Sequence, residues 1–306
     1  MDTAFHRPAH RHLGDQFYGF LLTTPGILLI VFFTVFPFIL NIYVSFTGYT
    51  LINQNLSPVG LVNYRQVIKD GILWNTTLRT LIWTAGSFIP IFLLGVLCSL
   101  VMNSRIRGIS ILRALILLPW IMPEVVTGYN FQWMFSGDYG IVWTYLVKWG
   151  TISKDFTFFT SPAGALFAVI LANVWRGFPF VAVMSYAKLK TIPAEQIEAA
   201  IIEGTNPLQR FVYITIPWLF PILKRCAFLV FVWNFNSFSI IYTMTKGGPG
   251  ATTETFPVMI QRIAFRMLDF RQATTLGTFS ALIVVVVLVA VYVMSMIIRK
   301  GRVRHT

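Results

Sequence analysis

The sequence predicts an all-α polytopic membrane protein with six transmembrane helices, and its composition is the first reason. Hydrophobic residues make up 56% of the 306 residues and charged residues only 11%, whereas a soluble domain has about 25% charged residues. The mean hydropathy is +0.70. A soluble fold could not bury this much apolar surface, so lipid is expected to be the main solvent. We expect residues 1–306 to form a single transmembrane domain.

The second reason is that six apolar segments have about the 20 residues that a helix needs to cross the hydrocarbon core. None shows the alternating ten-residue pattern of a membrane barrel, and unpaired backbone groups in lipid are costly, so the spans are expected to be helices. The first is too long, and too interrupted by Pro25 and Pro37, for a cleaved signal peptide. The six predicted spans are residues 20–45, 80–102, 112–135, 164–187, 227–245 and 275–298.

The positions of Lys and Arg predict the orientation of these spans. If the amino terminus is cytoplasmic, the cytoplasmic segments hold 14 of the 24 basic residues, the outer segments hold 9, and Arg176 lies within a span. This excess favours both termini inside. It also accounts for the net charge of +13 without a nucleic-acid partner, because the basic residues are scattered over four segments rather than gathered on one face.

The loop between the fourth and fifth spans, residues 188–218, is predicted to hold two short cytoplasmic helices. Gly204 can end the first helix in a left-handed conformation. Thr205 or Asn206 caps the second helix, and Pro217 is expected to end it. The first helix has an apolar stripe, which either docks in a groove of a partner or packs on the protein's own bundle. Its members at helical spacing are Ile197, Ala200, Ile201 and Gly204.

Arg176 and Glu124 are charged residues at a similar depth in two predicted spans. A charge near the bilayer centre costs at least about 2.5–3.5 kcal/mol, so it is expected to be paired or to mark a pathway. One interpretation is a structural Arg176–Glu124 ion pair. The other is that Arg176 meets a carboxylate or phosphate on a substrate.

The motif in the cytoplasmic loop resembles the EAA loop of bacterial ABC importer permeases. The family pattern is roughly E-A-A-x-x-D-G followed by I-x-L-P, and Glu203 and Ile216 are mild departures from it. By this resemblance, the loop couples the permease to a cytoplasmic ATPase. The residues that match the coupling motif are Glu198, Ala199, Ala200, Glu203 and Gly204.

The resemblance extends over nearly the whole chain and is closest to the carbohydrate-uptake type, in particular the maltose-type larger permease subunit. Runs such as Leu118-Pro119-Trp120 and Gly247-Gly248-Pro249 are similar to that group. The sequence departs from it near the amino terminus, where it has only residues 47–78 in place of a large extracytoplasmic insertion. The resemblance implies that residues 246–271 face a solute-binding protein.

The resemblance also implies the partners and the mechanism. A second, homologous permease subunit completes the pore, two cytoplasmic ATPase subunits drive it, and an extracytoplasmic binding protein delivers a carbohydrate. The location is the bacterial cytoplasmic membrane. Because the sequence has no G-x-x-x-x-G-K-[ST] loop, ATP and Mg are expected on the ATPase subunits, and no cofactor is expected in this chain.

Polar and small residues at mid-depth in the spans are the candidate substrate pathway. Amides, hydroxyls and an aromatic plane are groups that bind sugars, and in the maltose-type permeases equivalent positions form the sugar site. The alternative is that the amides form helix–helix hydrogen bonds, worth about 0.6 kcal/mol each. The candidates are Asn173, Arg176, Gly177, Phe180, Asn234, Asn236 and Ser237.

Other functions are less well supported by the sequence. Within the same family, a permease for glycerol phosphate diesters or polyamines is the alternative. A channel would not require the two-helix loop, and a membrane enzyme or metal site would require clustered ionisable groups. Cys98 and Cys226 have no metal-ligand spacing. The four histidines lie near the ends of the chain, at His6, His10, His12 and His305.

Overall fold

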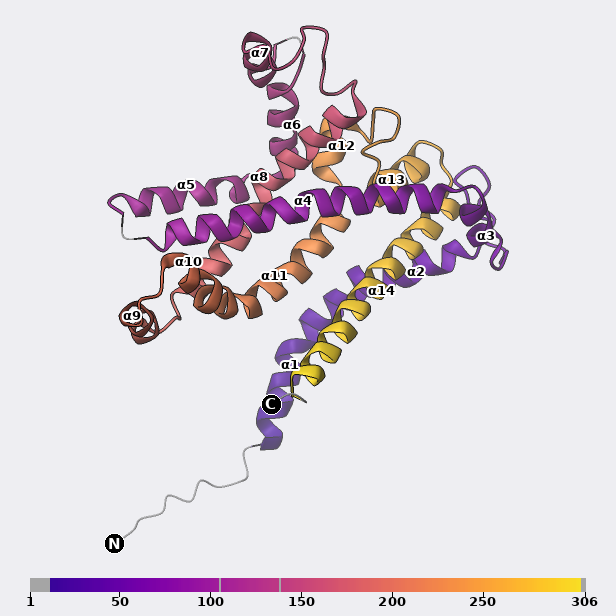
Figure 1. The fold of residues 1–306 in the computed structure, drawn as a ribbon. Coiled ribbons are helices and arrows are strands. Elements are labelled where there is room, and N and C mark those ends of the chain that lie inside the picture. The colour runs from indigo at the N-terminus through magenta and orange to yellow at the C-terminus, as the bar shows by residue number, and fades with distance from the viewer. Residues whose placement is uncertain (1–11, 105, 138, 304–306) are drawn as a thin grey trace.

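Long helices form most of residues 12–104, 106–137 and 139–303, which are the residues that this computed structural model describes, and no β-strand occurs among them (Figure 1). Five helical segments in this part of the chain are long and apolar enough to cross a membrane, and a bent pair of helices makes a sixth when it is counted as one span. The prediction of an all-α membrane protein is therefore confirmed, with five to six candidate spans. Arg7, Arg11, Arg105 and Arg304, which contribute to the predicted charge bias, lie outside the described residues.

The helices follow one another with short connections. The elements are α1 (His12–Ile30), the π-helical segment η2 (Val31–Val35), α2 (Phe36–Ser45), α3 (Val62–Lys69), α4 (Ile72–Met102), α5 (Ile109–Ile121), α6 (Glu124–Met134), α7 (Ile141–Lys148), α8 (Pro162–Leu189), α9 (Ala194–Ile202), α10 (Pro207–Arg210), the π-helical segment η3 (Phe211–Thr215), α11 (Ile216–Phe235), α12 (Ser239–Thr245), α13 (Phe256–Phe265) and α14 (Phe270–Val303).

The third span differs from the continuous helix that the sequence predicts. Helix α5 ends at Ile121, Met122 is extended at φ −69° and ψ 134°, and α6 begins at Glu124. The two helices meet at an angle of 97°. The physical reason is Pro123, because a proline ring disfavours the helical conformation of the residue before it.

The fifth span is both longer and more interrupted than predicted. Helical structure runs without a stop from Pro207 to Phe235, so the prediction that Pro217 ends the second cytoplasmic helix is wrong. In the preceding π-helical turn the N–H of Ile216 bonds to Phe211 O. That wider turn shifts the hydrogen-bond register, and the chain accommodates a proline that has no N–H to donate. Helix α11 then ends, and residues 236–238 join it to α12.

Small residues let α4 and α8 pack closely along their length. A Cβ added to Gly95 of α4 would lie 2.6 Å from Cβ of Val181 on α8, and one added to Gly177 of α8 would lie 2.8 Å from Cδ1 of Ile91 on α4. Close backbone approach through small residues is a general way for membrane helices to associate. These two helices form the scaffold against which the broken spans pack.

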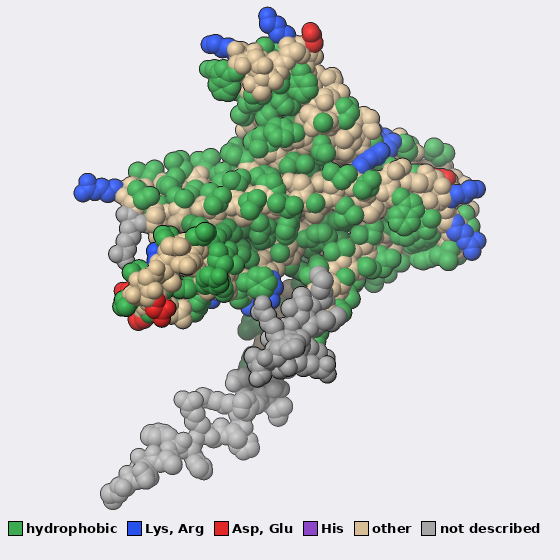
Figure 2. Space-filling view, in the orientation of Figure 1, with side chains coloured by type: hydrophobic (Ala, Val, Ile, Leu, Met, Phe, Trp, Pro, Cys, Tyr) green, Lys and Arg blue, Asp and Glu red, His purple; other side chains and the backbone are tan. Residues whose placement is uncertain are grey.

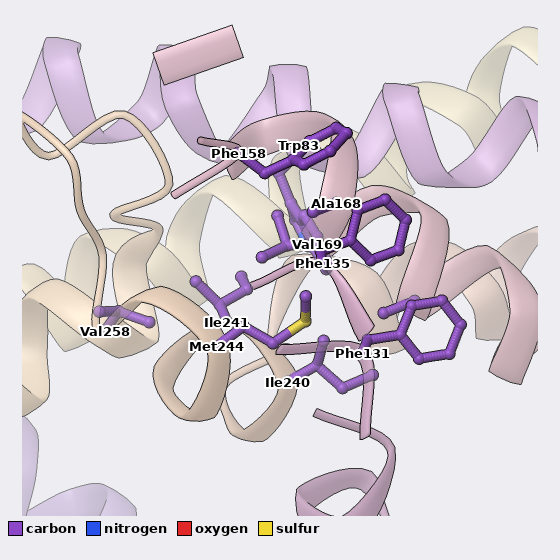
Figure 3. Close-up of a cluster of buried hydrophobic side chains, with 11 residues drawn as sticks. Trp83, Phe131, Phe135, Phe158, Ala168, Val169, Ile240, Ile241, Met244 and Val258 are labelled. Carbon is purple, nitrogen blue, oxygen red and sulfur yellow. The ribbon is translucent and has the colours of Figure 1, made fainter. Parts of the chain in front are cut away.

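A buried apolar cluster joins this scaffold to the broken spans at one end of the molecule (Figure 3). Trp83 of α4 and Ala168 and Val169 of α8 belong to the same buried cluster as Phe131 of α6 and Ile241 of α12. By contrast, the segment Phe17–Ser45 is apolar, and none of its most apolar 18-residue window is buried within the chain. Figure 2 shows hydrophobic side chains over most of the visible face of the helices, as expected for surfaces that meet lipid.

Candidate functional site

A cavity of about 470 Å³ lies where the two helix breaks face α4 and α8. The seven residues predicted for the substrate pathway all line it, together with Glu124. Its lining also includes aromatic and apolar residues that the sequence analysis did not propose as site residues. The lining residues are Ile91, Trp120, Glu124, Asn173, Arg176, Gly177, Phe180, Val230, Val232, Trp233, Asn234, Asn236, Ser237, Phe238 and Ser239.

The helix geometry explains why these residues meet. Asn173, Arg176, Gly177 and Phe180 of α8 have i, i+3, i+4, i+7 spacing, so they share one face. The break in the third span places Glu124 in the first turn of α6. The break after α11 places Asn236, Ser237 and Phe238 in a short non-helical connection at the cavity wall.

The charged pair of the cavity is formed by Arg176 and Glu124. Arg176 Nη1 lies 3.1 Å from Glu124 Oε1, and the two side chains are 26% and 36% exposed. Glu124 is at the amino-terminal end of α6, where the helix dipole favours a negative charge. Arg176 Nε is buried and has no hydrogen-bond partner. The pair therefore has donor capacity that is not used within the protein.

The amide residues of the cavity have different surroundings. Asn173 Nδ2 donates to Asn234 Oδ1 over 2.8 Å, and Trp83 Nε1 donates to the backbone oxygen of Asn234 over 2.8 Å. Asn234 is 5% exposed, and its Nδ2 has no partner. Asn236 is exposed, and its Nδ2 donates to Val232 O in the last turn of the preceding helix, α11. Asn173 and Asn234 thus join α8 to α11, and the buried Nδ2 group of Asn234 has no hydrogen-bond partner within the protein.

Aromatic rings form an apolar surface in the same cavity. The ring of Phe180 lies 5.9 Å from that of Trp120 and 4.9 Å from that of Trp233, centroid to centroid. Of these three, only Phe180 was proposed from the sequence. Trp233 is next to Asn234 in the sequence, and Trp120 lies just before the break at Met122–Pro123. This proximity to a predicted site residue and to a proline is the signal that could have identified the two tryptophans. Gly177 contributes by allowing Ile91 to approach.

The loop of residues 188–218 contains the first predicted short helix, α9, and the start of a second helix that continues into the fifth span. Gly204 follows α9 with φ +77°. Asn206, one of the two predicted caps, forms a capping box with Gln209 at the start of α10. Nη1 of Arg210 donates to Thr205 O, which fixes the turn between the helices.

The coupling residues proposed from the sequence lie mostly on the exposed side of α9. Ala200 is 8% exposed and packs against the protein, whereas Glu198, Ala199, Glu203 and Gly204 are exposed. Figure 2 shows acidic side chains gathered over this helix.

The predicted apolar stripe of α9 is partly buried against the rest of the protein and partly exposed on the surface. Ala200 is buried, but Ile201 is 53% exposed, and the neighbouring Ile202 is 87% exposed. Further exposed apolar side chains follow in the second helix, where Leu208 is 69% and Tyr213 is 76% exposed. The loop is anchored to α11, because Trp218 Nε1 donates to Gln196 Oε1 over 3.0 Å. An anchored helix with an uncovered apolar surface is suited to docking against another protein.

A family model described as "Binding-protein-dependent transport system inner membrane component" matches residues 91–301. The chain belongs to this family of transporter permeases. The match includes the loop of residues 188–218 and all the residues that line the cavity. Within the described residues, no group of three or more His, Cys, Asp or Glu side chains is placed to hold a metal ion.

Several relatives of this permease have been assigned substrates. It is 30% identical over 241 residues to the trehalose/maltose transport system permease protein MalF of Thermococcus litoralis, covering 79% of this chain and 81% of that protein. It is 31% identical over 288 residues to the sulfoquinovosyl glycerol transport system permease protein SmoG of Agrobacterium fabrum, covering 94% and 91%.

A solved structure has the same fold as this permease. A chain of a bacterial alginate ABC transporter, solved in complex with an alginate pentasaccharide-bound periplasmic protein, superposes with a TM-score of 0.81 and 18% sequence identity. The match covers 92% of the permease and 95% of that chain. At this identity the likeness establishes the fold.

Proposed function

We propose that this permease forms half of the pore of an ATP-driven, binding-protein-dependent importer of oligosaccharides. The observation that supports this most directly is the cavity, which combines aromatic rings, amides, a hydroxyl and a charged pair at the breaks of two spans. Broken helices at mid-membrane are typical of substrate sites in transporters. The relatives named for trehalose/maltose and sulfoquinovosyl glycerol agree with a sugar-containing substrate.

The cavity chemistry fits a sugar ring. A pyranose has apolar C–H faces, which suit Phe180 and Trp233, and hydroxyl groups around its edge that donate and accept hydrogen bonds. Asn234 Nδ2 and Arg176 Nε are buried donors without protein partners, and Asn236 and Ser237 provide further polar groups. A volume of about 470 Å³ lies within the range of roughly 300–1,000 Å³ of small-molecule sites.

The cytoplasmic loop, residues 188–218, is the proposed contact with the ATPase. Glu198, Ala199 and Glu203 present polar and small groups outward, and Ile202 adds exposed apolar area. Ala200 holds the helix against the bundle, and Gly204 sets the turn. ATP and Mg bind to the ATPase subunits, and a rigid docked helix transmits their movement to the spans.

The remaining partners follow from the same arrangement. A second, homologous permease subunit completes the pore, and two ATPase subunits dock on the cytoplasmic side. An extracytoplasmic solute-binding protein contacts the outer loop, residues 246–271. With the loop 188–218 in the cytoplasm, an even number of spans places both termini there, in the bacterial cytoplasmic membrane.

The cavity favours sugars over the alternative substrates. A polyamine carries several positive charges and requires several carboxylates, but Glu124 is the one carboxylate among the described residues of the lining, and it is already paired with Arg176. A phosphate diester requires a free cation, and Arg176 is the one cation of the same lining. Both would have to break the pair.

The function is tested with the complete transporter in proteoliposomes that contain ATP, supplied with its binding protein outside. We expect uptake of an oligosaccharide, about tenfold weaker with Phe180→Ala, and ATP hydrolysis that no longer responds to substrate with Ile202→Asp. Asp70→Asn, at an exposed position away from cavity and loop, is the control. Uptake without ATP would indicate a channel, and uptake of no saccharide would contradict the proposal.

A further inference from the structure

The names of the relatives do not agree on the charge of the substrate. Trehalose and maltose are uncharged, whereas a sulfoquinovosyl group carries a sulfonate. At about 30% identity neither name transfers to this permease, so the charge has to be inferred from the cavity. The relevant feature is the Arg176–Glu124 pair, since these two are the charged residues among those described in the lining.

We propose that Glu124 makes this cavity selective for uncharged sugars by balancing the charge of Arg176. This inference rests on the proposed function and names the substrate class for the same site. The formal charge of the lining is zero, with one carboxylate and one guanidinium. The two groups are in contact at 3.1 Å and are partly exposed, so they belong to the cavity surface rather than to the protein interior.

An uncharged sugar can bind without separating the pair. Glu124 Oε1 contacts the guanidinium, and Oε2 is able to accept from a sugar hydroxyl. The Arg176 side chain is 26% exposed, and its guanidinium has N–H groups beyond the one that faces Glu124, so it can donate to ring or hydroxyl oxygens. A carboxylate beside a guanidinium therefore offers an acceptor and a donor to neighbouring hydroxyl groups.

An anionic sugar encounters two unfavourable effects at the same place. Its anionic group either displaces Glu124 from Arg176, which leaves a carboxylate without a cation inside the membrane, or shares the guanidinium with that carboxylate. It also lies close to that carboxylate and is repelled by it. Selectivity of this kind arises from unfavourable contacts with the rejected ligand as much as from favourable contacts with the preferred one. Glu124 is thus a specificity-determining residue, placed in the cavity by the break at Pro123.

The test measures binding to the complete transporter without its binding protein, so that the selectivity of the binding protein plays no part. The probes are a neutral glucose disaccharide and the same disaccharide with a C6 carboxylate, and their affinities are compared by saturation-transfer NMR. The wild type is expected to bind the neutral probe at least about tenfold more tightly, a difference of about 1.4 kcal/mol. Glu124→Gln is expected to reduce that ratio at least about tenfold.

Two further variants separate charge balance from general damage to the site. The double variant E124Q/R176Q restores neutrality, so its ratio is expected to return towards that of the wild type. Asp70→Asn removes one negative charge at an exposed position outside the cavity and is expected to leave the ratio unchanged. An unchanged ratio in Glu124→Gln, or a wild type that prefers the acidic probe, would overturn this inference but not the proposed function. Binding of neither probe would contradict the proposed function as well.

Discussion

Asn173 on α8 donates a hydrogen bond of 2.8 Å to Oδ1 of Asn234 on α11, in the wall of the cavity. Both residues are buried, at 7% and 5% exposure. Trp83 of α4 donates to the backbone oxygen of the same asparagine. Three membrane helices are therefore joined at Asn234. The side chain of Asn234 keeps one N–H group, Nδ2, without a hydrogen-bond partner, and the proposed function places this residue in the substrate pathway.

This bond predicts non-additive effects of substitution on stability. Asn173→Ala leaves Asn234 Oδ1 without its donor, and Asn234→Ala leaves Asn173 Nδ2 without its acceptor. We expect an interaction free energy of about 0.6 kcal/mol, with an upper limit of about 1.7 kcal/mol, as for other hydrogen bonds between membrane helices. The measurement is a double-mutant cycle on thermal unfolding of the purified transporter.

Asn236→Ala is the matched control for that cycle, because its Nδ2 bonds locally, to Val232 O in the last turn of α11. It is expected to change stability independently of Asn173. If Asn173→Ala and Asn234→Ala were strictly additive, the hydrogen bond would contribute nothing to holding α8 on α11.

The polar residues of the cavity and Phe180 could be predicted from the sequence, whereas Trp120 and Trp233 could not. Asn173, Arg176, Gly177 and Phe180 have the spacing of one helix face, and polar residues in a membrane span are expected to face inward. Trp120, by contrast, stands in an apolar run, where an aromatic side chain can equally well face lipid. The packing of α5 against α8 places the Trp120 ring 5.9 Å from that of Phe180, and the sequence alone does not show that packing.

The breaks themselves were missed for a related reason. Pro123 disfavours a helix at the preceding residue, but membrane helices often tolerate proline, because neighbouring groups satisfy the freed backbone. Pro90 and Pro179 lie inside the continuous helices α4 and α8. The same residue type therefore breaks one span and not the others, and the difference comes from tertiary packing.

The contact between α4 and α8 predicts that Gly95→Ala is destabilising. The added Cβ would lie 2.6 Å from Cβ of Val181 and 3.1 Å from the backbone oxygen of Phe178. Because these atoms are on or near the backbone, the helices must separate, at an expected loss of about 1–3 kcal/mol. The measurement is the thermal unfolding of the purified transporter.

Val181→Ala removes Cγ1, which would lie 2.8 Å from the added Cβ, but keeps Cβ at 2.6 Å. The double variant G95A/V181A is therefore expected to recover only a small part of the loss. Gly19→Ala is the control, since nothing lies within 4 Å of its added Cβ. If the loss of stability in G95A/V181A exceeded the sum of the losses in the two single variants, steric contact with Val181 would not be the cause.

The backbone of Gly204 predicts a specific defect in coupling. Its φ is +77°, and an added Cβ meets nothing within 4 Å, so Gly204→Ala introduces backbone strain alone, about 1 kcal/mol. Strain there is expected to change the angle of α9 and to weaken the stimulation of ATP hydrolysis by substrate. Gly204→Asn is expected to be milder, because asparagine tolerates the left-handed conformation.

A matched glycine elsewhere separates coupling from general strain. Gly150 has φ +72° and no atom within 4 Å of its added Cβ, and it follows α7, outside the cytoplasmic loop. Gly150→Ala is expected to leave the stimulation of ATP hydrolysis intact. Equal effects of Gly150→Ala and Gly204→Ala would remove the coupling interpretation of Gly204.

The outer loop depends on a buried carboxylate, and this predicts a large local effect of neutralising it. Glu254 is 3% exposed, its Oε1 lies 2.5 Å from Arg262 Nε, and its Oε2 lies 3.8 Å from Arg79 Nη1. Glu254→Gln leaves two guanidinium groups without an anion. The expected loss is about 1–3 kcal/mol, below the 3–5 kcal/mol of a fully buried pair, because both arginines are about one-third exposed.

The loss is expected to be local and is measured as faster amide hydrogen exchange between residues 246 and 266. Asp269→Asn removes the same charge from an ion pair with Arg271, whose side chain is 39% exposed, and should cost less than about 1 kcal/mol. Because the two variants change the net charge equally, only the buried position of Glu254 can explain a difference between them. Equal exchange rates in both would mean that Glu254 does not hold the loop that the proposed function assigns to the binding protein.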